Sequence, residues 1–205
     1  MKKPNHAGSG QIRIIGGQWR GRKLPVPESP GLRPTTDRVR EALFSSLEAR
    51  DVIDGAHVMD LYAGSGALGL EAASRGAARV VLVEHDRRAA ATIRRNVADL
   101  GLDGVVTVAA RAVSAVLDGP PADADLVFLD PPYDVGEDVL AGVLAALAAA
   151  HLTPEAVVVV ERSSRSPEPT WPPGVHRTGD RTYGETRAWY AQASAPPDPD
   201  GTMGP

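Results

Sequence analysis

The sequence has no cysteine among its 205 residues, which excludes disulfide bonds, thiolate metal sites and cysteine nucleophiles. Its five histidines lie far apart without metal-ligand spacing, so no metal is expected. No apolar run approaches the roughly 18 residues of a membrane span, and the first residues, Met-Lys-Lys-Pro-Asn-His, lack the apolar core of a signal peptide. We therefore expect a cytoplasmic monomer with no membrane partner.

Acidic residues are scarce only near the N-terminus. Residues 1–50 hold ten basic and four acidic residues, a net charge of +6, whereas residues 51–205 hold twelve and twenty-two, a net charge of −10. This asymmetry is typical of a basic arm on an acidic body, and such an arm suits a nucleic-acid partner. The alternative is a solvated surface with uneven charge.

The length favours one domain with short appendages. Residues 1–10 and the Pro-, Asp- and Gly-rich tail 193–205 are expected to be disordered. Residues 11–30 contain β-branched residues around a Gly-Gly pair and predict a basic hairpin extension, and residues 31–192 form the main domain. A first helix is expected to be capped by Thr35, Thr36 and Asp37, with an apolar face of Val39, Ala42, Leu43 and Leu47.

From residue 57 onward, short apolar runs alternate with helical stretches. Strands are expected at about 57–61, 79–83, 105–109, 125–129 and 156–160, and helices at about 66–75, 87–99, 112–117 and 136–149. A last pair of strands, at about 175–179 and 186–191, is expected to add an antiparallel hairpin to the sheet edge. The pattern predicts an α/β fold with a seven-stranded, mostly parallel Rossmann-like sheet and the small N-terminal hairpin.

A glycine-rich turn follows the strand that ends at Asp60. Gly64, Gly66 and Gly69 match the spacing G-x-G-x-x-G, in which backbone closely approaches a ligand, although such turns also close ordinary βα units. Asp60 would repel a phosphate and favours a cationic or hydroxyl-rich ligand. S-adenosylmethionine, with its sulfonium and ammonium groups, therefore fits better than NAD.

Glu84 ends the second strand, where an acidic group can accept hydrogen bonds from both ribose hydroxyls of a nucleoside. Asp86 either contacts the ligand as well or only starts the next helix. The residues expected to bind S-adenosylmethionine are Asp60, Tyr62, Gly64, Ser65, Gly66, Glu84, Asp86 and Ala112.

The tetrapeptide Asp130-Pro131-Pro132-Tyr133 directly follows the fourth strand and is the expected catalytic motif. The exocyclic amine of a base is a poor nucleophile because its lone pair is delocalised into the ring. The Asp130 carboxylate and the Pro131 carbonyl can accept its two N–H groups and free the lone pair, while Pro132 helps to fix the backbone. Tyr133 offers a face for stacking the base. The alternative is a rigid turn after a strand.

Two N-terminal runs, Arg13 to Pro25 and Leu32 to Phe44, closely resemble the opening of the RsmD family. The resemblance continues through Asp60 to Gly69, Asp130 to Tyr133 and the hairpin at Tyr183, so that it covers about residues 11–191. It implies a methyltransferase fold and methyl transfer from S-adenosylmethionine, with S-adenosylhomocysteine as product, to N2 of a guanine in 16S ribosomal RNA.

The resemblance also implies that the N-terminal hairpin holds RNA, as part of the small ribosomal subunit or of its assembly intermediate. The expected RNA-binding residues are Arg13, Trp19, Arg20, Arg22, Lys23 and Arg33. One departure is Arg111-Ala112, where related proteins carry a small polar residue beside an alanine near the adenine ring. The Ala112 amide can still contact adenine, whereas no base-reading role is expected of Arg111.

Two alternatives remain at this point. An N6-adenine methyltransferase acting on DNA uses the same Asp-Pro-Pro-Tyr chemistry, and the tetrapeptide does not separate adenine from guanine. A non-catalytic ribosome-assembly factor could keep the pocket without the reaction.

Overall fold

The computed structural model describes residues 10–26, 36–132 and 134–194. Some expectations fall on residues outside the described ranges. These are the roles of Arg33, Thr35 and Tyr133, and the disorder of both termini apart from residues 10, 193 and 194. The strands are β1 (Gln11–Arg13), β2 (Lys23–Pro25), β3 (His57–Asp60), β4 (Arg79–Val83), β5 (Val106–Ala109), β6 (Ala124–Leu129), β7 (Leu152–Ser163), β8 (Val175–Tyr183) and β9 (Thr186–Ala193). The helices are α1 (Asp37–Glu48), α2 (Ala67–Ser74), α3 (Arg87–Leu100), α4 (Val113–Leu117) and α5 (Glu137–Ala150).

Seven strands form one sheet in the order β5-β4-β3-β6-β7-β9-β8, and β1 pairs with β2 in a separate antiparallel hairpin. The five strands from β5 to β7 pair in parallel, whereas β9 runs antiparallel to both of its neighbours. The expected seven-stranded, mostly parallel fold with an antiparallel C-terminal hairpin is therefore confirmed.

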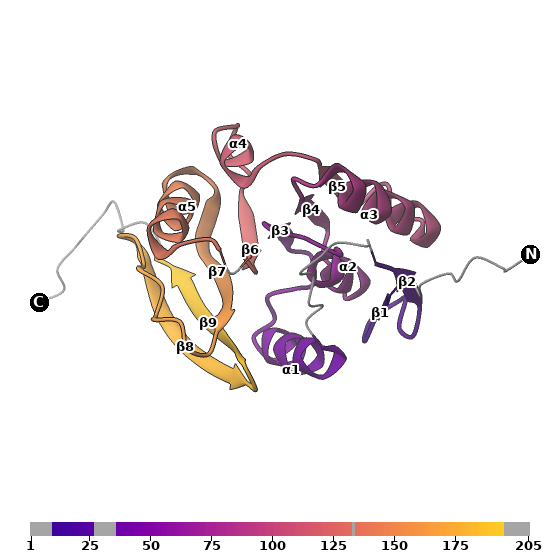
Figure 1. The fold of residues 1–205 in the computed structure, drawn as a ribbon, viewed down its shortest axis with the longest axis horizontal. Helices are drawn as coiled ribbons and strands as arrows, with labels where there is room; N and C mark the ends of the chain where they lie inside the picture. Colours follow the sequence, from indigo (N-terminus) through magenta and orange to yellow (C-terminus); the bar gives the residue numbers. More distant parts are fainter. Residues whose placement is uncertain (1–9, 27–35, 133, 195–205) are drawn as a thin grey trace, which may run out of the picture.

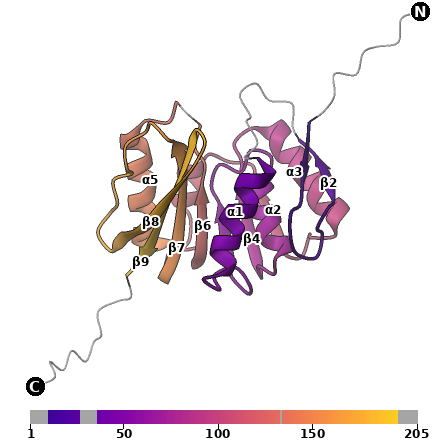
Figure 2. The same ribbon diagram turned by 90° about the horizontal axis from the view of Figure 1, so that it is seen from below.

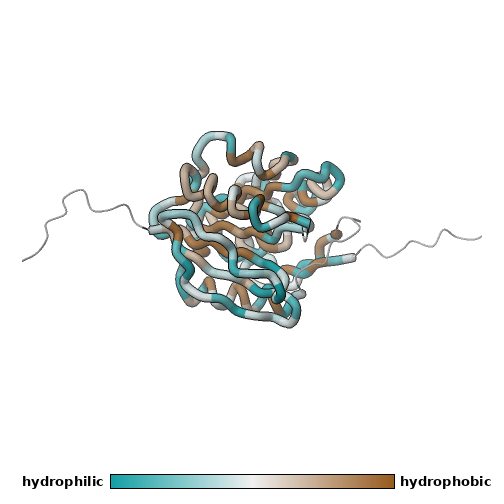
Figure 3. Tube along the Cα trace, turned by 60° about the vertical axis from the view of Figure 1, so that its left-hand side comes forward, coloured by the Kyte–Doolittle hydropathy of each residue, from teal (hydrophilic) through white to brown (hydrophobic). Residues whose placement is uncertain are grey.

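Helices cover both faces of the sheet (Figures 1 and 2). Alternate strand residues divide between the two faces, because successive side chains of a strand point in opposite directions. Val58, Leu82 and Phe128 pack with α1, α2, α3 and the hairpin, whereas Met59 and Leu129 pack with α4 and α5. Figure 3 shows the hydrophobic strands at the centre of the molecule.

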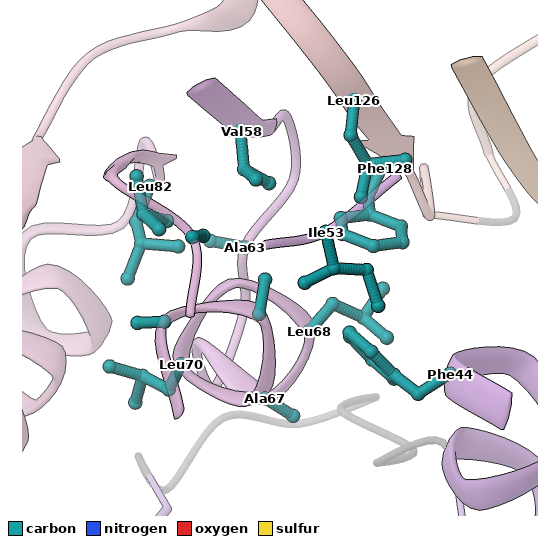
Figure 4. Packing of buried hydrophobic residues seen from close by; sticks show 14 of the residues in the cluster. Phe44, Ile53, Val58, Ala63, Ala67, Leu68, Leu70, Leu82, Leu126 and Phe128 are labelled. Atoms are coloured by element: carbon teal, nitrogen blue, oxygen red, sulfur yellow. The ribbon is translucent and has the colours of Figure 1, made fainter. Parts of the chain in front are cut away.

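Helix α1 packs through an aromatic contact (Figure 4). Phe44 lies against Phe128 of β6, with ring centroids 5.6 Å apart. The buried residues of α1 are Arg40, Leu43, Phe44 and Leu47, whereas Val39 and Ala42 are only half-buried. The expected apolar face was therefore wrong in part. Arg40 lies on the buried face, where its Nη2 donates to the Arg13 carbonyl (2.7 Å), a long-range contact that no local pattern reveals.

The N-terminal hairpin is fastened to α2 by backbone hydrogen bonds. The fully buried Glu71 carboxylate accepts from the N–H groups of Ile15 and Gly16, both at 2.7 Å. The Gln18 N–H donates to the Ser74 carbonyl (2.8 Å), and a Cβ at Gly17 would lie 1.7 Å from that carbonyl oxygen. The hairpin is therefore held in one orientation on the domain.

The last strands are longer than expected. Strand β7 spans Leu152–Ser163 rather than 156–160, and β8 continues to Tyr183. The reversal between β8 and β9 uses only Gly184 (φ +61°) and Glu185, instead of the six-residue connection that the sequence suggested. Among the described helices, none has the length and apolar character needed to span a bilayer.

Candidate active site

The expected site residues meet at the carboxyl edge of the sheet. In the sheet, β4 and β5 lie on one side of β3, whereas β6 and β7 lie on its other side. The carboxyl ends of strands at such a reversal of strand order form the usual ligand crevice of open α/β sheets. Asp60 ends β3, Glu84 follows β4 and Asp130 follows β6, so the structure brings these three carboxylates to one edge.

The glycine-rich turn joins β3 to α2. Gly66, the N-cap of α2, adopts φ +78°, where side chains are disfavoured, and Gly64 adopts φ +54°. Glycine is required at position 69 for a different reason, because a Cβ there would lie 2.1 Å from Leu82 Cδ2. Gly64 and Gly66 therefore shape the turn, whereas Gly69 lets α2 approach the sheet.

Glu84 ties this turn to the end of β4. Its Oε2 accepts from the Gly64 N–H at 2.9 Å, and its Oε1 accepts from the Asp86 N–H at 2.7 Å. The residue is only 7% exposed, so the carboxylate is held in place. His85 Nδ1 also lies 3.2 Å from Oε1, and because a carboxylate offers about four acceptor positions, acceptor capacity remains chiefly on Oε2.

Asp60 is buried beneath the start of α2, where its Oδ2 accepts from the Gly69 N–H at 3.0 Å. Burial raises the pKa of Asp60 to about 7, against the lowering effect of that hydrogen bond, and the negative charges of Asp130 and Glu84 raise it further. The site is thus rich in negative charge and suits a cation.

Asp130 leads the expected catalytic motif. The residue as a whole is exposed, yet the protein around its carboxyl raises the pKa of that group, whereas the nearby Arg162 guanidinium lowers it. The Pro132 carbonyl accepts from the Val135 N–H at 3.0 Å, whereas within the described residues no hydrogen bond to the Pro131 carbonyl is found. That the Asp130 carboxylate and the Pro131 carbonyl act as acceptors for a substrate stays a prediction.

Arg162 is a functional candidate that the sequence did not reveal. Register pairs Leu129 of β6 with Val160 of β7, so Arg162 lies two residues beyond the end of β6. The residue is 8% exposed, and its Nη2 donates to the Val135 carbonyl (3.0 Å) and to Glu137 Oε1 (2.6 Å). Arg162 thereby holds the segment that follows the expected catalytic motif. The only sequence signal was a charged residue at the end of an apolar run.

The remaining donor-binding candidates border the turn. Tyr62 is half-buried with φ +152°, and burial raises the pKa of its hydroxyl. Ser65 is buried. Asp86 caps α3, since its Oδ1 accepts from the Arg88 and Ala89 N–H groups, and Ala112 is the exposed N-cap of α4 beside exposed Arg111. Asp86 thus has a structural role of its own, and its contact with a ligand stays a prediction.

The hairpin presents its cations outward. Arg13, Arg20, Arg22 and Lys23 are exposed, whereas Ile12 and Leu24 point into the core. Trp19 is half-buried against the same core, which favours packing over base stacking. Throughout the described part of the chain, no three or more His, Asp or Glu side chains lie close enough together to hold a metal ion.

A second concave region does not belong to this site. It is lined by residues such as Leu152, Pro173 and Val175 at the starts of β7 and β8. This region therefore lies at the end of the sheet opposite to the carboxyl ends of the parallel strands, where Asp130 is found.

Comparisons with known proteins extend over most of the chain. The family model described as Conserved hypothetical protein 95 matches residues 12–192. Ribosomal RNA small subunit methyltransferase D of Escherichia coli strain K12 is 57% identical over 137 residues, which are 66% of this chain and 67% of that protein. The chain belongs to the RsmD family. The corresponding protein of Haemophilus influenzae is 42% identical over 139 residues, 65% of this chain and 70% of that protein.

Solved structures share the RsmD-family architecture. A putative methyltransferase from Escherichia coli is 41% identical, with a TM-score of 0.82 over 91% of this chain and all of that one. An RNA methyltransferase from Salinibacter ruber, in complex with S-adenosyl-L-homocysteine, is 19% identical, with a TM-score of 0.61 over 82% of this chain and 98% of that one. This last likeness shows the fold alone.

Proposed function

We propose that this RsmD-family protein transfers a methyl group from S-adenosylmethionine to the exocyclic N2 amine of a guanine in 16S ribosomal RNA. The observation that carries the chemistry is the position of Asp130 and Pro131 at the end of β6, beside the glycine turn after β3. The choice of RNA guanine over DNA adenine rests on kinship with the small-subunit ribosomal RNA methyltransferases. The substrate is the small ribosomal subunit or its assembly intermediate, in the bacterial cytoplasm.

The residues around the turn fit S-adenosylmethionine. Glu84 keeps acceptor capacity for the ribose hydroxyls, and Gly64 and Gly66 let the backbone approach the ligand. The negative charges of Glu84 and Asp130 both act on Asp60, so a donor with a positive sulfonium relieves this repulsion, whereas a dinucleotide phosphate would increase it. When bound, S-adenosylmethionine supplies an electrophilic methyl group.

The chain's own residues prepare the nucleophile. The Asp130 carboxylate and the Pro131 carbonyl accept the two N–H groups of the amine, which leaves its lone pair free for the methyl carbon. The nitrogen–carbon bond forms as the carbon–sulfur bond breaks, and the amine proton passes to Asp130 or to water. Arg162 favours the charged form of Asp130 and holds Val135, so the acceptors are already oriented. The target base must leave its stack to reach this edge.

Small subunits purified from a bacterial strain that lacks the enzyme provide the test. They are incubated with the protein and methyl-labelled S-adenosylmethionine, and the labelled base is mapped. Label on N2 of one guanine of 16S RNA supports the proposal. Label on adenine, transfer only to DNA, or no transfer despite donor binding would reject it.

A further inference from the structure

An arginine-rich side of α3 adjoins the hairpin. The helix carries Arg87, Arg88, Arg94 and Arg95 but only one acidic residue, Asp99. Arg88 and Arg95 are seven residues apart, so they lie on the same side of the helix, about 10 Å apart along its axis. Both are exposed. Asp86 before the helix attracts Arg88 and also caps the helix through Oδ1.

The hairpin lies against this side of α3, and β2 runs beside the helix in Figures 1 and 2. Asn96 donates to the Pro25 carbonyl at 3.0 Å, and Arg22 Nη2 donates to the Asp99 carbonyl at 3.4 Å. Positions 88, 92, 95 and 99 follow one line along a helix, so Arg88 and Arg95 continue the line that reaches Arg22. The cations of the two elements therefore form one surface.

The charges of this surface are only partly compensated. Lys23 stands directly opposite Arg13 on the outer face of the hairpin, and like charges in such pairs are destabilising. Arg13 lies 4.0 Å from Asp37. Among the described residues, no carboxylate forms an ion pair with Arg22, Lys23, Arg88 or Arg95, whereas the buried Arg75 and Arg162 each have an acidic partner.

We propose that Arg88 and Arg95 of α3 extend the hairpin's RNA-docking surface to the edge of the donor site, where they bind phosphates of the substrate RNA. The proposal rests on the proposed function above. Helix α3 begins three residues after Glu84, so one end of this line reaches the donor site and the other reaches the hairpin. A row of exposed cations binds backbone phosphates and carries no sequence information, so it positions the RNA while the Asp130 site selects the base.

The test is the double variant Arg88→Gln/Arg95→Gln, since glutamine is nearly as good a helix former as arginine. Its matched control is Arg165→Gln/Arg181→Gln, which removes two exposed cations near β8, at the sheet edge farthest from α3 and β5. Binding of 16S RNA transcript is titrated at several salt concentrations. We expect the slope of log K against log salt to fall by about 1.4 to 1.8 units for the α3 variant, and to stay unchanged for the control.

Calorimetry with S-adenosylmethionine verifies that both variants keep a folded donor site. An α3 variant with the slope of the wild type overturns the inference, as does an equal loss in the control. These results differ from failure of the proposed function, in which the wild-type protein itself transfers no methyl group to 16S RNA.

Discussion

The Glu84 carboxylate accepts a hydrogen bond from the Gly64 N–H at 2.9 Å, which joins the end of β4 to the glycine turn after β3. This bond spans 20 residues of sequence and fixes the acceptor group relative to the turn before a nucleoside arrives. A site oriented in advance binds with less loss of conformational entropy.

We therefore expect Glu84→Ala to weaken binding of S-adenosylmethionine and S-adenosylhomocysteine alike, by about 1.5–3 kcal/mol, the scale of hydrogen bonds to a charged group. Calorimetry with both ligands measures this. The comparison variant Asp86→Asn keeps an oxygen to cap α3 and removes only the charge. Unchanged affinity of Glu84→Ala for both ligands would contradict the ribose assignment.

Asp130→Ala should lower the methyl-transfer rate at least about a hundredfold, because the protein loses one preorganised acceptor for the reacting amine. Donor affinity should change much less. Single-turnover transfer to small subunits gives the rate, and Asp138→Ala, an exposed carboxylate on α5, serves as control. Near-normal turnover by folded Asp130→Ala would remove this residue from the mechanism.

Arg162→Met should move the acid limb of the pH–rate profile upward. Arg162 lowers the pKa of Asp130, so its loss leaves the raising effect of the protein surroundings unopposed. We expect a shift of about one pH unit, the lower end of the effect of one nearby cation. Arg162→Lys keeps the charge and should leave the limb in place, even if the weaker hold on Val135 lowers the rate. A limb that moves equally in both variants contradicts the electrostatic role.

Asp60 should make the ligand-free protein less stable as the pH rises from about 4 to 7. Its folded-state pKa of about 7 exceeds the usual 3.8, so the folded state binds the proton more tightly in this range. Asp60→Asn keeps an acceptor for Gly69 and should remove the loss, which amounts to as much as about 4 kcal/mol above pH 7. Denaturant titrations between pH 4 and 8 measure it. Parallel curves for variant and wild type would refute this assignment.

Neutralising Arg20, Arg22 and Lys23 together should weaken RNA binding while leaving donor binding intact. The hairpin is held by backbone bonds to Glu71 and by apolar side chains, so these charges contribute little to its packing. The salt slope should fall by nearly one unit per charge that meets a phosphate. Lowered thermal stability with an unaltered slope would indicate a packing role instead.

The strand and helix pattern from residue 57 onward was predictable because buried parallel strands are continuous apolar runs, and Asp60, Glu84 and Asp130 could be placed because each ends such a run. The contacts of Arg162 and Glu71 could not be predicted. Glu71 meets Ile15 across 56 residues and Arg162 meets Val135 across 27, and no local periodicity encodes such pairs. The boundaries of β7 and β8 depended likewise on pairing with β9, which lengthens strands beyond their apolar centres.

The attachment of the hairpin to Glu71 and Ser74 fixes the distance between its outward cations and Asp130. If the outward cations bind phosphates as proposed, the protein rather than the RNA sets the distance between a bound phosphate and the base at Asp130. In the proposed function, a guanine would then reach the site only at that offset from the bound backbone, so a surface that reads no sequence would still help to choose a single nucleotide.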